Sequence, residues 1–91
     1  MITLKDRIFS DMKDAMINRD QERLDAIRLL RADIQRREVD ERVELDNEGV
    51  QTVIKKMIKQ CNKAILQFNK GNRPDLIAKD KYLIGVLQEY Q

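Results

Sequence analysis

The chain has 91 residues, of which 42% are hydrophobic and 37% are charged, and its formal net charge is +2. This length fits one small domain, predicted to span residues 1–91, and no apolar run approaches the roughly eighteen residues of a membrane helix. The sequence contains no histidine, which excludes Ser-His-Asp and Cys-His nucleophiles and the ordinary histidine-based zinc sites.

The composition favours an all-α fold. Aromatic residues make up 4% of the chain, tryptophan is absent, and there are one proline and three glycines. The core must therefore come from leucine, isoleucine, valine, methionine and alanine, which suit packed helices better than a sheet. A sheet-rich domain also needs more turn residues than this chain has. We expect four helices joined by short connections.

The first two helices occupy the N-terminal half. Thr3 can cap the first helix, and Asp6 stands where a capping box needs its second partner. That helix is expected to end near residues 18–20, where Asp20 can cap the next one. The second helix is longer and is expected to end around residues 43–45. Its predicted apolar stripe consists of Leu24, Ala26, Ile27, Leu29, Leu30, Ile34 and Val39.

The last two helices carry similar signals at their ends. Asp46 can cap the third helix, and Gly71 is the expected left-handed residue after it. Asn72 is predicted to cap the fourth helix, with Pro74 in its first turn. Cys61 lies on the apolar stripe of the third helix, so we expect a buried structural thiol. Because the connections are short, consecutive helices should pack as antiparallel hairpins in a compact bundle.

A one-sided basic surface on the third helix is the most informative feature of the chain. From Gly49 to Pro74 there are six cationic side chains and no acidic one. At 100° per residue the five lysines fall within an arc of about 100°, away from the apolar stripe. We call these five residues the lysine ridge: Lys55, Lys56, Lys59, Lys63 and Lys70. The sixth cation, Arg73, follows the helix.

Acidic residues are concentrated just before the lysine ridge. Residues 38–48 hold six acids against one arginine, Arg42. If this segment folds back along the third helix, its acids would neutralise the first lysines. Lys63, Lys70 and Arg73 lie farther along the chain and would be harder to reach. The six acids are Glu38, Asp40, Glu41, Glu44, Asp46 and Glu48.

The lysine ridge has two interpretations. A solvated face would keep a small domain soluble when its opposite side is apolar. A phosphate-binding face would use the same charge to hold a polyanion such as RNA, and Arg28 and Arg31 of the second helix would add to it. Phosphate contacts alone give affinity without sequence discrimination. Tyr82 and Tyr90 could stack on bases, but we expect them at the edge of the bundle with exposed hydroxyls.

The order and spacing of residues along essentially the whole chain resemble YqeY-type proteins. The matching positions in the first half are Leu4–Ile8, Asp11–Met16, Asp20, Arg23–Leu24, Ile27–Leu30, Glu38–Asp40 and Leu45–Asp46. Those in the second half are Val53–Gln60, Phe68, Gly71, Arg73, Asp75–Leu76, Lys79 and Leu87–Tyr90.

YqeY-type proteins are similar to the tail of GatB, a subunit of the glutamine-dependent amidotransferase that amidates misacylated Glu-tRNA or Asp-tRNA. The resemblance implies an all-helical, tRNA-associated module, the GatB/YqeY-like N-terminal helical domain. Amidotransferase chemistry belongs to other domains, so no catalytic residue is implied. Proteins of this type usually continue after the position of Tyr90 into a smaller helical domain, which we expect to be absent here.

The expected function is that of a non-catalytic module that binds tRNA or another structured RNA. Its candidate RNA-binding residues are Lys56, Lys59, Lys63, Lys70, Arg73, Arg28 and Arg31. The alternative is a protein-interaction or self-associating helical module with no role in RNA binding. No cofactor, metal or membrane contact is expected. The single cysteine, and the charged segment 1–9 in place of an apolar signal sequence, predict a cytoplasmic protein.

Overall fold

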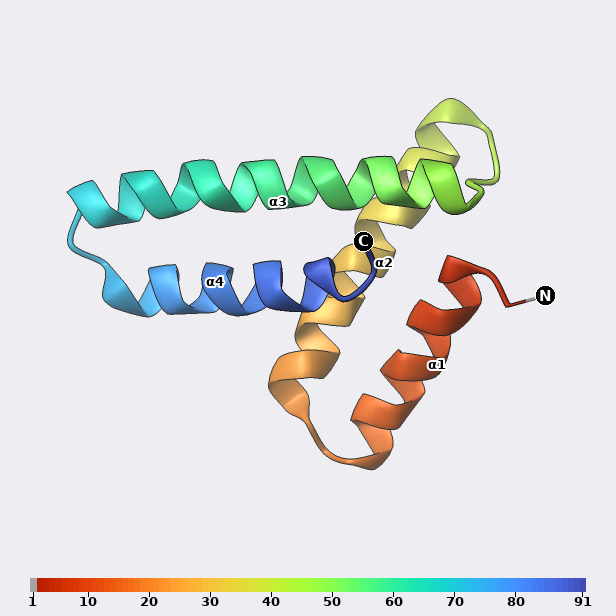
Figure 1. Cartoon of the computed structure of the whole chain (residues 1–91), viewed down its shortest axis with the longest axis horizontal. Coiled ribbons are helices and arrows are strands. Elements are labelled where there is room, and N and C mark those ends of the chain that lie inside the picture. Colours follow the sequence, from red (N-terminus) through yellow and green to blue (C-terminus); the bar gives the residue numbers. More distant parts are fainter. Residues whose placement is uncertain (1) are drawn as a thin grey trace. The chain divides into compact units, whose positions relative to one another are not determined.

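The computed structural model of the chain describes residues 2–91, and four helices account for most of them (Figure 1). The helices are α1 (Leu4–Ile17), α2 (Gln21–Glu41), α3 (Asn47–Lys70) and α4 (Pro74–Gln88). No strand occurs within residues 2–91, so the predicted all-α class is confirmed. None of these helices is both long and apolar enough to cross a bilayer.

The chain divides into two compact units. The first unit ends at Val53 and contains α1, α2 and the first turns of α3. The second unit, Ile54–Gln91, contains the rest of α3 and all of α4. Helix α3 therefore contributes to both units, and each unit is described by itself below.

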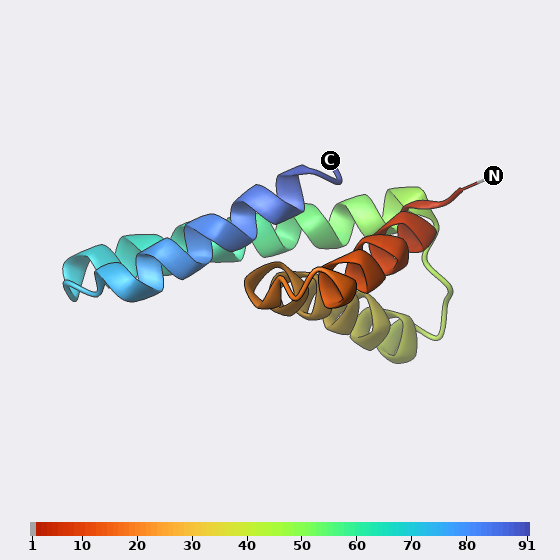
Figure 2. The same ribbon diagram turned by 90° about the horizontal axis from the view of Figure 1, so that it is seen from below.

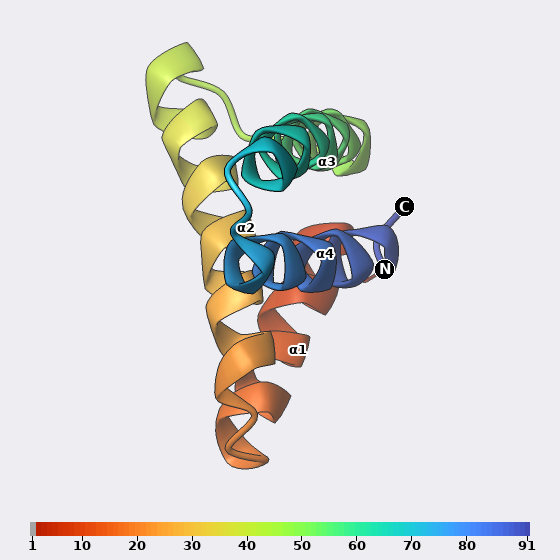
Figure 3. The same cartoon turned by 90° about the vertical axis from the view of Figure 1, so that its left-hand side faces the viewer.

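In the first unit, α1 and α2 pack against each other as an antiparallel hairpin closed by residues 18–20 (Figure 1, Figure 3). Apolar side chains recur along both helices at spacings of three and four residues, which gathers them on one face. The buried residues of the two helices are Ile8, Ala15, Leu24, Ala26, Ile27, Leu30 and Ile34. The middle of α2 is the best-shielded part of the hairpin, because Ile27 and Leu30 have no exposed surface.

Side-chain caps determine where the helices of this unit begin. Thr3 and Asp6 form the predicted capping box, in which the N–H of Asp6 donates to Thr3 Oγ1 at 3.1 Å and the N–H of Thr3 donates to Asp6 Oδ2 at 3.2 Å. Asp20 and Asp46 cap α2 and α3 as predicted, each accepting a backbone N–H bond at 3.3 Å and 2.8 Å, respectively. Each cap satisfies an N–H group that has no partner within its helix, which stabilises the helix by about 1 kcal/mol.

Two details of α2 differ from the prediction. The helix ends at Glu41, because Arg42 adopts the left-handed conformation with φ +54°. Leu29 and Val39, predicted on the apolar stripe, are 49% and 69% exposed. At 100° per residue, both lie roughly 60° beyond the arc of the buried residues. The stripe that α2 buries is therefore narrower than its hydrophobic pattern indicated.

In the second unit, α4 runs back antiparallel beside α3 (Figure 1, Figure 2). The left-handed residue of the connection is Asn72, with φ +55°, so the prediction of Gly71 for this position was wrong. Asparagine tolerates this conformation better than most residues. Asn72 is then unable to cap α4 as predicted, since an N-cap needs an extended backbone. The N-cap residue is Arg73, which makes no side-chain cap hydrogen bond.

Burial in the second unit confirms one prediction and corrects another. Cys61 is buried, as its place on the apolar stripe predicted. Tyr90 is only 1% exposed, so the prediction of an edge residue with a solvated hydroxyl was wrong for it. Hydrogen-bonded turns continue past the end of α4, with the N–H of Tyr90 donating to the carbonyl of Leu87 at 3.1 Å. This helix-like turn keeps Tyr90 in line with the apolar stripe of α4.

Candidate nucleic-acid interface

The lysine ridge lies on the surface of α3, in the second unit. Helix α3 is continuous from Asn47 to Lys70, so the five lysines keep the angular spacing that the sequence predicted. All five side chains are exposed. Met57 and Cys61, which belong to the apolar stripe of the same helix, are buried. Helix α3 therefore presents a row of ammonium groups to solvent on the side away from its buried stripe.

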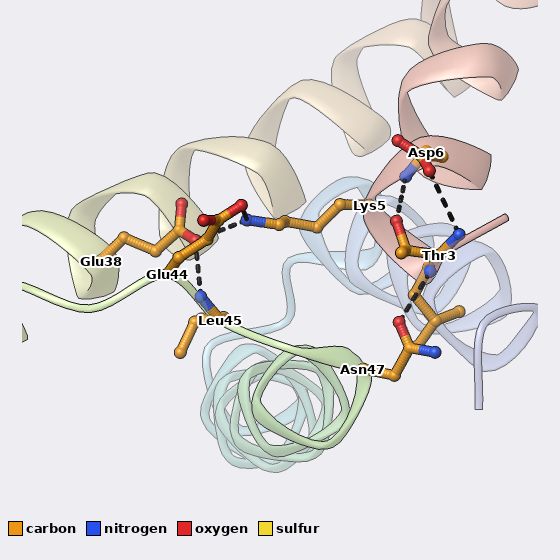
Figure 4. A network of polar contacts seen from close by, with 8 residues as sticks. Thr3, Lys5, Asp6, Glu38, Glu44, Leu45 and Asn47 are labelled. Atoms are coloured by element: carbon orange, nitrogen blue, oxygen red, sulfur yellow. Dashed lines mark hydrogen bonds and ion pairs between the residues drawn. The ribbon is translucent and has the colours of Figure 1, made fainter. Parts of the chain in front are cut away.

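Acids do not pair with the lysine ridge within residues 2–91. The acidic segment 38–48 forms its ion pairs elsewhere, inside the first unit. Glu38 accepts a hydrogen bond from Lys5 Nζ at 2.6 Å, and Glu44 lies 3.7 Å from the same ammonium group (Figure 4). Glu41 pairs with Arg37 on its own helix. The ion pairs of this segment thus neutralise cations of α1 and α2.

The Lys5 and Glu38 charges stabilise each other. The hydrogen bond to Glu38 raises the pKa of Lys5 above its ordinary value, while burial acts in the opposite direction. The same hydrogen bond is the largest cause that lowers the pKa of Glu38. The hydrogen bond that Glu38 accepts from the N–H of Leu45, at 2.7 Å, lowers it further. Both effects favour the charged forms. The carboxylate of Glu38 therefore ties the segment before α3 to the hairpin of α1 and α2.

Arg73 lies in the connection between α3 and α4, next to the end of the lysine ridge. Its side chain is 58% exposed, and its Nε atom is 3.6 Å from Asp75 Oδ1. An exposed pair at this distance contributes little to stability. The nearby carboxylate nevertheless offsets part of the charge that Arg73 could offer to a phosphate. Arg73 is thus a weaker phosphate-binding candidate than the lysines.

Arg28 and Arg31 belong to α2, in the first unit, so the seven candidate residues are divided between the units. Both arginines are exposed. The guanidinium of Arg31 lies over the ring of Phe9, 4.9 Å from its centroid, and its NH1 group lies 3.1 Å from the sulfur of Met12. The structure places Lys56, Lys59, Lys63 and Lys70 along one helix face, while Arg28 and Arg31 form a separate group.

Leu66 is a residue of this surface that the sequence reasoning missed. It is 64% exposed and lies three residues after Lys63 and four before Lys70. Its helical phase, within the arc of the lysines, was the signal that could have identified it. The surface of the lysine ridge is therefore not purely polar, because it includes an apolar side chain between Lys63 and Lys70.

Neither a reactive thiol nor a metal site is indicated within residues 2–91. Burial raises the pKa of the Cys61 thiol, and the negative charge of Asp80 adds to this effect. A thiol with a raised pKa is a poor nucleophile, because the thiolate is the reactive form. Residues 2–91 contain no cluster of three or more potential metal ligands. The electrostatic surface of α3 is the better candidate for function.

The chain is similar to several fungal proteins, each named "Altered inheritance of mitochondria protein 41, mitochondrial". It is 34% identical to the protein of Kluyveromyces lactis over 82 residues, which are 89% of this chain and 44% of that protein. It is 32% identical to that of Eremothecium gossypii and 33% identical to that of Lachancea thermotolerans, in both cases over 81 residues, 88% of this chain, and 44% and 43% of those proteins. The chain thus spans less than half the length of these relatives.

The names of these relatives contradict the predicted cytoplasmic location, because they describe mitochondrial proteins. That prediction rested on one cysteine and on the lack of an apolar signal in segment 1–9. Such a signal marks secretion only, whereas mitochondrial targeting segments are amphipathic and rich in arginine. A single cysteine and the lack of an apolar signal sequence are therefore compatible with a mitochondrial protein as well as a cytoplasmic one.

The whole-chain resemblance seen in the sequence is confirmed by comparison with protein families. A family model described as "Yqey-like protein" matches residues 5–91. The match covers all four helices apart from the first residue of α1. The chain therefore belongs to the YqeY-like protein family.

Proposed function

We propose that this chain is a non-catalytic module that binds tRNA or another structured RNA through the lysine ridge. One observation carries the proposal: five exposed lysines share one helix face, and no acid within residues 2–91 pairs with them. The similarity of YqeY-type proteins to the tail of GatB selects tRNA as the first RNA to examine. Leu66, exposed among the lysines, would supply an apolar contact beside the phosphates.

The geometry of the ridge suits a nucleic-acid backbone. From Lys55 to Lys70 the helix rises by about 22 Å, a distance that covers several successive phosphates. Lysine binds phosphate as a point charge and places few demands on its exact position. Such contacts give strong salt dependence and little sequence discrimination. The proposed ligand is therefore an RNA recognised by the arrangement of its backbone.

A charge reversal on the ridge tests this proposal. In a mobility-shift titration with tRNA at low salt, Lys59→Glu/Lys63→Glu should lower the affinity at least about tenfold, because two phosphate contacts are replaced by repulsion. The slope of log affinity against log salt should also fall by about 2. The matched control is Lys79→Glu/Lys81→Glu, which makes the same charge change at exposed positions of α4.

The control separates a binding surface from general electrostatic attraction. Equal losses of tRNA affinity in the two double variants would show that net charge alone attracts tRNA. Absence of a shift with the unmodified chain at low salt would also refute the proposal. Circular dichroism should show the same helix content in both variants as in the unmodified chain, because all four lysines are exposed.

A second candidate function is self-association through the outer face of α2. Leu29, Ala32 and Val39 are exposed and lie within an arc of about 80° on this helix. Ala32 and Val39 also line a shallow depression with Arg36. Sedimentation velocity should then show a dimer at micromolar concentrations that Val39→Glu abolishes. A monomer at every concentration would reject this candidate and leave the RNA proposal untouched.

A further inference from the structure

A groove of about 260 Å³ lies between α1 and α2 in the first unit, and none of its lining residues belongs to the lysine ridge. Its apolar wall includes Ile8 and Ile34, which are both buried. Phe9, Arg31 and Gln35 also line it, as do the paired side chains of Lys5 and Glu38. The volume is slightly below the usual range for drug-sized ligands, so the groove suits a smaller group. Its mixture of apolar and polar walls suits a planar ligand with hydrogen-bonding edges.

Phe9 gives the groove an aromatic and cationic margin. Its side chain is 40% exposed, whereas the neighbouring Ile8 of the same helix is 1% exposed. Lys13 Nζ lies 4.5 Å from the centroid of the Phe9 ring, and the guanidinium of Arg31 lies 4.9 Å from it. Nucleic-acid bases stack on aromatic rings and on guanidinium planes alike. Two cations beside the ring would also attract a phosphate.

Hydrogen-bonding groups that lack partners line the groove as well. The amide of Gln35 has no hydrogen bond to any residue in the range 2–91. In Glu38, Oε2 accepts from Lys5 and from the N–H of Leu45, whereas its second oxygen makes no hydrogen bond to a described residue (Figure 4). The groove thus offers an amide donor, an amide acceptor and a carboxylate acceptor.

We propose that this groove binds one unpaired nucleotide. The base lies against the apolar wall and the Phe9 and Arg31 pair, its edge bonds to Gln35 and to the second oxygen of Glu38, and Arg31 holds the phosphate. A carboxylate acceptor favours bases that carry an amino group, so guanine, adenine and cytosine should bind better than uracil. The inference rests on the proposed function only in assigning the nucleotide to an RNA.

The test is a titration of the full chain with the 5′-monophosphates of guanosine, adenosine, cytidine and uridine. NMR spectra monitor binding through the backbone amide and side-chain NH signals. We expect shifts at Phe9, Arg31 and Gln35, with weaker binding of uridine monophosphate. Ribose 5-phosphate, which lacks a base, should cause much smaller shifts. Gln35→Leu should weaken binding about five- to tenfold, the value of a lost hydrogen bond. Gln60→Leu, a matched change at an exposed position of α3, should have no effect.

Two outcomes would overturn the inference. Equal shifts with ribose 5-phosphate would show an anion site that does not recognise a base, and no shifts at millimolar nucleotide would show no site. The Lys59→Glu/Lys63→Glu variant separates this inference from the proposed function. It should bind mononucleotides like the unmodified chain even though it loses tRNA, because the groove contains no residue of the lysine ridge.

Discussion

Replacing Ile27 with alanine is expected to lower the free energy of unfolding by about 2–5 kcal/mol. Ile27 is 0% exposed in the middle of α2. The substitution removes three carbon atoms from a packed hairpin and leaves a cavity that its neighbours cannot completely fill. A small domain has only about 5–15 kcal/mol of stability in total, so the loss is a large fraction. Urea denaturation followed by circular dichroism measures it directly.

The control for Ile27→Ala is the same chemical change at Ile17. This residue ends α1 and is 78% exposed, so its side chain gains little from folding. Ile17→Ala should change the free energy of unfolding by no more than about 0.5 kcal/mol. Similar losses in both variants would contradict the burial that the structure assigns to α2.

Replacing Glu38 with glutamine is expected to lower the free energy of unfolding by about 1–3 kcal/mol at neutral pH, because a hydrogen bond between charged groups is lost. Glu38 Oε2 accepts from both Lys5 and the N–H of Leu45 (Figure 4). Glutamine has a similar shape, but it carries no charge to balance the ammonium group of Lys5. Glu41→Gln is the control, since it breaks an exposed pair with Arg37 worth only about 0.3–0.5 kcal/mol.

The contribution of Glu38 should also depend on pH in a defined direction. Its pKa is lowered by folding, so its stabilisation is complete above the ordinary value of 4.5 and is lost as the pH falls through the folded pKa. The pKa of Lys5 is raised, so its stabilisation is complete below 10.5 and is lost as the pH rises through the folded pKa. The stability difference between the unmodified chain and Glu38→Gln should therefore narrow in strong acid. A difference that stays constant to about pH 2 would contradict this account.

The starts of α1, α2 and α3 were predictable because their signals are local, whereas the predicted cap of α4 was wrong. Thr3 and Asp6 stand three residues apart, and each contacts the other's backbone within one turn. Asp20 and Asp46 cap their helices for the same reason. The lysine ridge was also predictable, since helical periodicity alone places its members on one face.

Features that depend on packing or on competing backbone choices were not predictable. Both Gly71 and Asn72 could take the left-handed position, and only the complete turn selected Asn72. The exposure of Leu29 reflects how narrow a stripe α2 buries, which its own sequence does not reveal. The groove needed Phe9 of α1 and Gln35 of α2 to lie together, although they are far apart in the chain.

The bond between Lys5 and Glu38 joins residues 33 positions apart, at the end of the hairpin opposite its short turn. Contacts near the turn close small loops and should form first, whereas this bond must wait until both helices have aligned. An interaction made late in folding acts mainly on the rate of unfolding. Glu38 would therefore determine how long the hairpin persists once formed, and hardly how fast it forms.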